Sequence, residues 1–382
     1  MKKTILYSAA TLLCGFVSCN NVETPPAEGS KTGFALSFFK NVNATADPDE
    51  NIVVSPYSTG VALSMLTQGA EGQTRVELDN ALNGCDFKAE SFGAGDTVVV
   101  RSANSVWIDD DFSVRNHYVN VLEKDYDALA TTLNFSDPAT AHAINNWCSE
   151  HTDGKVNEVI KQLPSNIVMM LANAVYFKAP WLDQFNERAT RDEVFHGQSG
   201  DRNVRMMNRK GRYAYAEYQG AQMIELPYEG GRYSMYLILP PADMKMKNIG
   251  TYLNQSVFES AVKMLAPAEV RFSLPKMKLE TSLNLNNTLK SMGVVTAFGS
   301  AADFKGISAM GPLSLGDVAQ KCYIDVTESG TEAAAVTTVS IALTSARPEM
   351  NVKVMKVDRP FLFMIADKES DIILFAGKII DL

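Results

Sequence analysis

The sequence is poor in the residues on which most catalytic and metal sites depend. Its 382 residues include four histidines and five cysteines. The histidines do not fall in an HExxH or other paired metal spacing, and the cysteines form no CxxC motif. The GxSxG elbow, the P-loop and the GxGxxG fingerprint are also missing. We therefore expect no catalytic residues, no metal ligands and no cofactor, and a protein that is not an enzyme.

Long apolar runs are lacking too, except near the N-terminus (residues 1–19, MKKTILYSAATLLCGFVSC). Two lysines precede an apolar run that is too short to cross a bilayer, which predicts a signal peptide over residues 1–18. Its ending, VSC, resembles a bacterial lipoprotein cleavage site, although Phe16 stands where leucine is commonest. A plain signal peptide is the alternative. The polar linker at residues 19–31 favours a lipid on Cys19, and hence an exported protein anchored to the bacterial outer membrane on its periplasmic or outer side.

Basic residues are in deficit. The chain has 35 Lys and Arg against 44 Asp and Glu, a net charge of -9. An acidic surface disfavours binding to nucleic acid and to other polyanions.

Cysteines that could form a disulfide framework are also scarce. Cys14 would leave with the signal peptide, and Cys19 would carry the lipid. The remaining three, Cys85, Cys148 and Cys322, are odd in number and widely spaced. They predict buried free thiols.

Apolar periodicity predicts helices and strands in mixed order. Helices are expected at residues 32–42, 56–69, 72–82, 118–126, 139–152, 249–265 and 283–292. Strands are expected at residues 51–54, 98–108, 167–178, 212–217, 222–228, 233–239, 269–279, 313–326, 359–366 and 371–379. This mixture predicts an α+β fold with much antiparallel sheet, and the length allows one large domain or two.

One segment, residues 328–346 (ESGTEAAAVTTVSIALTSA), contains no Lys, Arg or Pro. In a strand, alternate side chains from Thr331 onward would form one small-to-apolar face, and the other face would carry Glu332. An ordinary buried strand, or a helix seeded by the three alanines, is the alternative. However, the run is long for a strand, and its β-branched block is poor helix material. The residues that follow, 345–352, have the composition of an exposed loop.

Several motifs follow one another in a fixed order from about residue 32 to the C-terminus. They are NIVVSPYSTGVALSML at 51–66, the stretches at 69–74 and 144–147, TDGKV at 152–156, NAVYFKAPW at 173–181, the stretch at 289–298, ADFKGIS at 302–308, GTEAAA at 330–335, and the stretches at 358–364 and 374–379. Taken together, these motifs resemble the serpin family of serine protease inhibitors.

The resemblance implies one domain, residues 32–382, with three β-sheets, about eight or nine helices and an exposed reactive-centre loop at about residues 328–358. In this family a protease attacks the loop and forms an acyl-enzyme, and the cut loop inserts as a new central strand of the main sheet. The implied partner is a serine protease, with cysteine proteases as a wider option, in a covalent complex with a monomeric inhibitor. The alternative is a non-inhibitory member that acts as a surface binding protein, but hinges of such members tend to carry bulky, charged or proline residues.

The same resemblance assigns the reactive bond and the hinge. The family usually places the cut bond at the seventeenth residue counted from the position of Glu328, which gives Thr344–Ser345. Leu343–Thr344 is the alternative, because the loop is several residues longer than usual. Small uncharged residues here suit elastase-like or subtilisin-like targets, whereas Leu343 suits a chymotrypsin-like protease. The hinge comprises Glu328, Gly330, Thr331, Glu332, Ala333, Ala334 and Ala335.

Three residues, Ser55, Ser58 and Asn173, match the "shutter" of the family, the point at which the main sheet parts. Gln320 stands where the family often has histidine, and its amide donates and accepts hydrogen bonds but does not titrate. The alternative interpretation is that Ser58 caps a helix and Asn173 is a satisfied core amide. The interval 78–103 is too short for the extra helix that binds heparin in many animal members, so we expect no heparin site.

Overall fold

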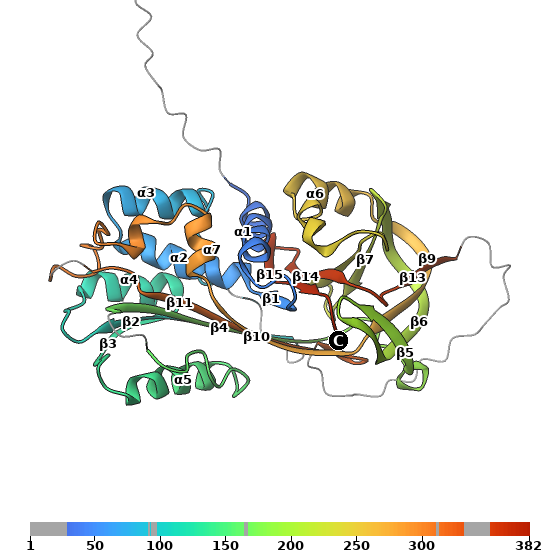
Figure 1. The fold of residues 1–382 in the computed structure, drawn as a ribbon, viewed down its shortest axis with the longest axis horizontal. Helices are drawn as coiled ribbons and strands as arrows, with labels where there is room; N and C mark the ends of the chain where they lie inside the picture. The colour runs from blue at the N-terminus through green and yellow to red at the C-terminus, as the bar shows by residue number, and fades with distance from the viewer. Residues whose placement is uncertain (1–28, 91, 93–97, 164–166, 311–312, 332–351) are drawn as a thin grey trace, which may run out of the picture.

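The computed structural model describes residues 29–382 except 91, 93–97, 164–166, 311–312 and 332–351. Within these ranges the chain is elongated, with a six-stranded sheet towards one end and a nine-stranded sheet towards the other (Figure 1). The predicted α+β class is confirmed. The predicted signal peptide, residues 19–28 of the predicted linker and most of the loop segment lie outside the described residues. The last residue of the predicted linker, Lys31, is the first residue of a helix that Ser30 caps.

The six-stranded sheet carries the features that matter for function. Its strands lie in the order β10-β11-β12-β4-β2-β3. Their bounds are β10 Met277–Asn284, β11 Asp317–Thr327, β12 Gly330–Thr331, β4 Met169–Pro180, β2 Val99–Asp109 and β3 Ala128–Leu133. Strand β4 is apolar almost throughout because side chains pack on both of its faces. Helices α2, α3, α4 and α7 lie over one face of this sheet, and α5 lies under the other (Figure 1).

The nine-stranded sheet has the order β1-β15-β14-β8-β7-β6-β9-β13, and β5 also pairs with β6. The bounds are β1 Ile52–Val54, β15 Ile372–Ile379, β14 Phe361–Asp367, β8 Tyr233–Leu239, β7 Ala221–Pro227, β6 Gly200–Tyr218, β9 Ala266–Pro275, β13 Lys353–Lys356 and β5 Arg191–Gly197. Three sheets were expected, but the described residues form two hydrogen-bonded sheets. The reason is β6, whose 19 residues pair with β5, β7 and β9 and so join two smaller sheets into one.

Seven α-helices occur in the described ranges, against the eight or nine expected. They are α1 Lys31–Thr45, α2 Pro56–Gly69, α3 Gly72–Ala81, α4 Asn116–Tyr126, α5 Ala139–His151, α6 Gln255–Lys263 and α7 Asn286–Ser291. Three short 3-10 helices supplement them at Glu187–Ala189, Met246–Thr251 and Thr296–Phe298. The start of the helix predicted at 249–265 is 3-10, and its α-helical part is α6.

Candidate functional site at the opening of the six-stranded sheet

Strands β4 and β11 pair directly along only part of their length. Their parallel pairing covers six residue pairs, from Asp317 opposite Met170 to Cys322 opposite Val175. Beyond this point the two strands no longer pair with each other, although both continue. The sheet is therefore open at this end.

The two residues of β12 occupy the opening. Gly330 and Thr331 pair antiparallel with β11 on one side and with β4 on the other. Their partners are Thr327 and Pro180 for Gly330, and Val326 and Ala179 for Thr331. The first two residues of the predicted loop-inserting strand are thus already in the sheet, directly before the range 332–351.

Gly330 is required by the backbone at this point. Its φ of +153° lies in a region that favours glycine, and a Cβ added here would sit 2.2 Å from the carbonyl oxygen of Ala179. Only a residue without a side chain can pass between β4 and β11 in this conformation.

An aromatic pair holds the next residue, Thr331, which is completely buried. Its Oγ1 lies 2.7 Å from the hydroxyl of Tyr228, and either atom can donate. The Tyr228 ring stacks on Trp181 at 4.5 Å with an interplanar angle of 13°. The indole Nε1 of Trp181 in turn donates to the carbonyl oxygen of Thr327, at 3.0 Å. Both ends of β12 are therefore fixed.

The hinge begins at a buried, charged anchor. The Glu328 carboxylate accepts hydrogen bonds from Lys276 Nζ at 2.7 Å and from Thr190 Oγ1 at 2.8 Å. Backbone amides of Phe185 and Trp181 donate to the carbonyl oxygens of Glu328 and Ser329. Burial alone would raise the pKa of the Glu328 carboxyl, but the bonds from Lys276 and Thr190 outweigh it and hold the pKa below its ordinary value.

We expect acid to loosen this anchor. Because the pKa of Glu328 is lower in the folded chain than in the unfolded chain, its stabilisation is fully present above the unfolded value of about 4.3. This stabilisation is lost as the pH falls from there through the lower pKa of the folded chain.

Glu328→Gln should therefore reduce the free energy of unfolding at pH 7 by about 2 kcal/mol, the scale of hydrogen bonds to a charged group. Denaturant unfolding of both chains between pH 7 and pH 3 measures this, and the difference should shrink towards pH 3. The exposed Glu158→Gln is the matched control, and a pH-independent difference for Glu328→Gln would refute the anchor.

The four predicted shutter residues come together beneath the opening. Gln320 lies opposite Asn173 in the β11–β4 pair, with Nε2 3.3 Å from Asn173 Oδ1. The Gln320 amide also exchanges hydrogen bonds with the backbone N and O of Ser55, at 2.9 and 3.0 Å. Asn173 Nδ2 donates to the carbonyl oxygen of Ser58 at 3.2 Å. All four residues are buried, so this polar cluster links α2 to both strands that meet there.

The alternative interpretation of Ser58 as a helix cap is wrong. The cap of α2 is Ser55, whose hydroxyl accepts from the backbone N of Ser58, and Ser58 lies inside the helix. The reason is Pro56, which occupies the first helical position and so makes the preceding residue the cap. The Ser58 hydroxyl instead lies 3.5 Å from that of Ser102 on β2.

Several residues of the site were not predicted. Asn104 on β2 extends the shutter cluster, accepting from Asn173 Nδ2 at 2.6 Å. Asn104 gives a weaker signal than Asn173, because β2 also contains Arg101, Ser102 and Ser105. Lys276 and Thr190 lie between strands, and the sequence around them contains no sign that they meet Glu328.

Other predicted residues lie outside the described ranges. They are Glu332, Ala333, Ala334 and Ala335 of the hinge, Leu343, Thr344 and Ser345 at the reactive bond, and Cys19. Their roles stay predictions.

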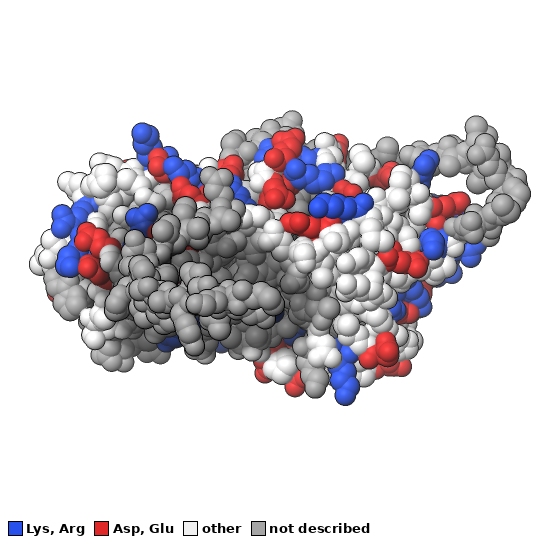
Figure 2. All heavy atoms as spheres, turned by 90° about the horizontal axis from the view of Figure 1, so that it is seen from above, with Lys and Arg blue, Asp and Glu red and all other residues white. Residues whose placement is uncertain are grey.

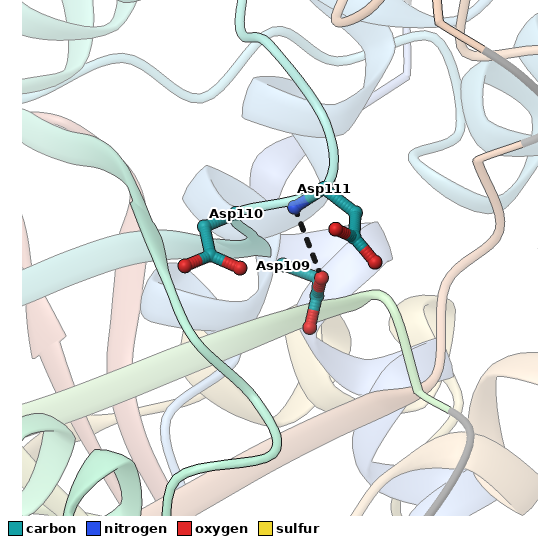
Figure 3. A group of neighbouring side chains, drawn as sticks. All are labelled: Asp109, Asp110 and Asp111. Carbon is teal, nitrogen blue, oxygen red and sulfur yellow. Dashed lines mark hydrogen bonds between the residues drawn. The ribbon is translucent and has the colours of Figure 1, made fainter.

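Three acidic residues lie close together at the end of β2. Carboxylate oxygens of Asp109, Asp110 and Asp111 lie within 4.8 Å of one another (Figure 3). Asp109, however, accepts from the backbone N of Asp111 at 3.1 Å and of Phe135 at 3.2 Å. Asp110 and Asp111 are exposed. These contacts are those of a side chain that caps a turn.

The surface charges are mixed. On the face seen in Figure 2, the described basic and acidic side chains alternate and do not gather into one basic patch. This pattern does not favour a polyanion on that face. None of the described helices is long and apolar enough to span a membrane.

Comparison with known proteins identifies the fold. The family model described as "Serpin (serine protease inhibitor)" matches residues 29–382. An uncharacterized serpin-like protein from Thermococcus kodakarensis is 33% identical over 93% of this chain and 86% of its own. Intracellular coagulation inhibitor 2 from Tachypleus tridentatus is 32% identical over 87% of this chain and 86% of its own. The native state of Tengpin, a thermophilic serpin, superposes with a TM-score of 0.84 at 30% identity, covering 92% of this chain and 93% of that one. The chain belongs to the serpin family of serine protease inhibitors.

Proposed function

We propose that this serpin traps serine endopeptidases by inserting its cut loop between β4 and β11. The observation that carries the proposal is β12, two residues of the loop already paired with both strands at the opening of the sheet. In the proposed reaction, the serine hydroxyl of the protease attacks a carbonyl carbon in the loop. The peptide C–N bond breaks, the new amine takes up the proton, and the protease is left esterified to the loop. Insertion then carries the attached protease away before water can hydrolyse the ester.

The register of β12 specifies where each inserted residue would lie. If pairing continues beyond Thr331 without a shift, each following residue falls opposite the preceding residue of both β4 and β11. Ala333 would then lie opposite Phe177 and Ile324, Ala335 opposite Val175 and Cys322, and Thr337 opposite Asn173 and Gln320. Glu332 would lie opposite Lys178 and Asp325. The small residues therefore share the face of Thr331, which is packed in the main core, and the charge falls on the other face.

Insertion would also suit the polar cluster. The new strand must separate Gln320 from Asn173, whose amides are in direct contact in the uncut chain. In the continued register, the hydroxyl of Thr337 enters between them and can bond to either amide. One parallel pairing of strands is exchanged for two antiparallel pairings, which are slightly more stable per residue.

The reactive bond, the target class and the membrane tether are proposed from the sequence. We infer a reactive bond at Thr344–Ser345, with Leu343–Thr344 as the second option, and elastase-like or subtilisin-like targets. We also propose a lipid on Cys19 that tethers the inhibitor to the outer membrane. The motif VSC and the polar linker support this tether.

A protease panel tests the function. The purified chain should form an SDS-resistant band at the summed mass with pancreatic elastase or subtilisin. Mass spectrometry of the released C-terminal fragment should show that it begins at Ser345 or Thr344. The contrary outcome is that each protease cuts the loop and stays active, or leaves the loop uncut. If every protease does one or the other, the chain is not an inhibitor of these classes, and the result favours the non-inhibitory alternative.

A further inference from the structure

A small cavity lies beside the hinge, where β6 and β7 part. Their pairing ends at Ala214 opposite Glu225, and β6 continues alongside β9. The segment after β4 then extends the end of β7, because the backbone N of Leu182 donates to the carbonyl oxygen of Pro227 at 2.9 Å. Between this segment and β6 a cavity of about 180 Å³ remains.

The cavity is lined by an unsatisfied buried hydroxyl. Tyr213 of β6 is only 7% exposed, and its hydroxyl is the single buried side-chain oxygen or nitrogen of the described chain without a hydrogen-bond partner. Burial raises the pKa of Tyr213 to about 12, although the neighbouring Arg209 lowers it in part. Because a guanidinium can only donate, the hydroxyl keeps its own proton free to donate to a ligand. A buried polar group without a partner is costly and rare, which points to a partner supplied from outside the chain.

The charges of the lining leave one cation unpaired. The two acids, Asp183 and Glu225, already form ion pairs with Arg209 at 3.1 Å and with Lys368 at 2.9 Å. The remaining charged group of the lining, Arg212, has no ion pair within the described chain and is exposed at the cavity. A ligand with a negative charge is therefore favoured over a neutral or positive one.

The other walls are apolar. Trp181, Phe185 and Leu182 contribute them, and the side chain of Leu182 is 56% exposed, unusually high for a large apolar group. The volume is close to the roughly 150 Å³ of an engineered apolar cavity that holds benzene. A ligand with one aromatic ring therefore fits the cavity.

We infer that this cavity binds a small aromatic carboxylate. Its ring would pack against Trp181 and Phe185, and its carboxylate would accept from the Tyr213 hydroxyl. Arg212, which also lines the cavity, would supply a charge of the opposite sign. The wall residues Trp181 and Phe185 donate backbone hydrogen bonds to Ser329 and Glu328 at the hinge. An occupied cavity therefore ties β6 to the segment that holds the hinge, and should stabilise the uncut chain.

Phenylacetate is the probe, and titration calorimetry and thermal unfolding are the measurements. We expect saturable binding to one site with a Kd of about 1 mM or tighter and a midpoint of unfolding that rises with ligand. Arg212→Gln and Tyr213→Phe should each weaken binding by about tenfold, as loss of a charged hydrogen bond does. Arg202→Gln, an exposed arginine on the same strand away from the cavity, is the matched control and should leave binding unchanged. Neutral phenylacetamide should bind more weakly than phenylacetate.

Two outcomes would overturn the site. One is the absence of any heat or midpoint shift at about 10 mM phenylacetate, and the other is an equal loss of affinity in Arg202→Gln. Tyr213→Phe gives an independent check without ligand: its unfolding midpoint should be equal to or above that of the wild type, because it removes an unpaired buried hydroxyl. A lower midpoint would mean that the hydroxyl has a partner. The measurements use no protease, so their result does not depend on whether the chain is an inhibitor.

Discussion

Ala333→Arg should abolish the covalent protease complex while leaving the loop cleavable. In the continued register, residue 333 faces the main core between Phe177 and Ile324, both almost fully buried. An unpaired guanidinium there costs several kcal/mol, and about 3 kcal/mol in the barrier is enough to slow insertion roughly 100-fold. The acyl-enzyme would then hydrolyse first. Gel analysis should show cut inhibitor and active protease where the wild type shows a stable complex.

Ala334→Arg, one residue further on, is the matched control. In the same register this residue lies on the opposite face, between Tyr176 and Tyr323. That face already accommodates cations, since the ammonium groups of Lys155 and Lys278 lie 5.9 and 5.7 Å from the Tyr323 ring. Ala334→Arg should therefore keep most of the complex. Equal loss in both variants would show that the loop does not insert in this register, and a persistent complex in Ala333→Arg would show that insertion does not bury this face.

Thr331→Arg would not test insertion alone, although Thr331 shares a face with Ala333 in the sequence pattern. Thr331 is already buried in the uncut chain, where it bonds to Tyr228. Arginine at this position would disturb the native hinge as well as the inserted form. The sequence predicts which residues share a face, because side chains alternate in any strand. It does not predict how far the strand has entered the sheet, because that depends on where β4 and β11 stop pairing.

The four predicted shutter residues show what motifs and residue chemistry can predict about buried contacts. Ser55 and Ser58 are far from Asn173 and from Gln320 in the sequence. A buried polar side chain needs a hydrogen-bond partner, and these residues bond to one another. The sequence could not predict the hydrogen-bond partners of Glu328, for a physical reason. Lys276 lies between β9 and β10, where the chain crosses from the nine-stranded to the six-stranded sheet.

One predicted strand, residues 269–279, spans this crossing, and strand β6 was only partly predicted. In residues 269–279 the apolar side chains alternate in one phase at Val270, Phe272 and Leu274 and in the other phase at Met277 and Leu279. The prediction of a single strand overlooked this shift at Pro275–Lys276, where the structure has two strands in different sheets. Strand β6 was predicted only at 212–217, because charged residues occupy much of its exposed first half. A strand that switches partners along its length, as β6 does, has no uniform pattern of buried and exposed residues.

Cutting the loop should make the chain much harder to unfold. In the uncut chain, residues 332–351 are tied to β12 at one end and to β13 at the other, so their ends are fixed. Once cut, the segment after Thr331 is free to replace the six-pair parallel contact of β4 and β11 with pairing on both sides. We expect the midpoint of thermal unfolding to rise by about 10 °C or more, which for a chain of this size corresponds to about 8 kcal/mol of added stability.

Calorimetry of the intact chain and of the chain nicked by a catalytic amount of protease measures the change. Nicked Ala333→Arg is the matched control: its loop is cut in the same place, but its arginine opposes insertion, so its midpoint should stay near that of the uncut chain. This pair separates insertion from the mere release of a loop, because both chains carry the same break. Identical unfolding curves for intact and nicked wild type would mean that no more stable form exists. The two residues of β12 would then be an ordinary end of the sheet, and the free energy needed to displace a protease would have no source in this fold.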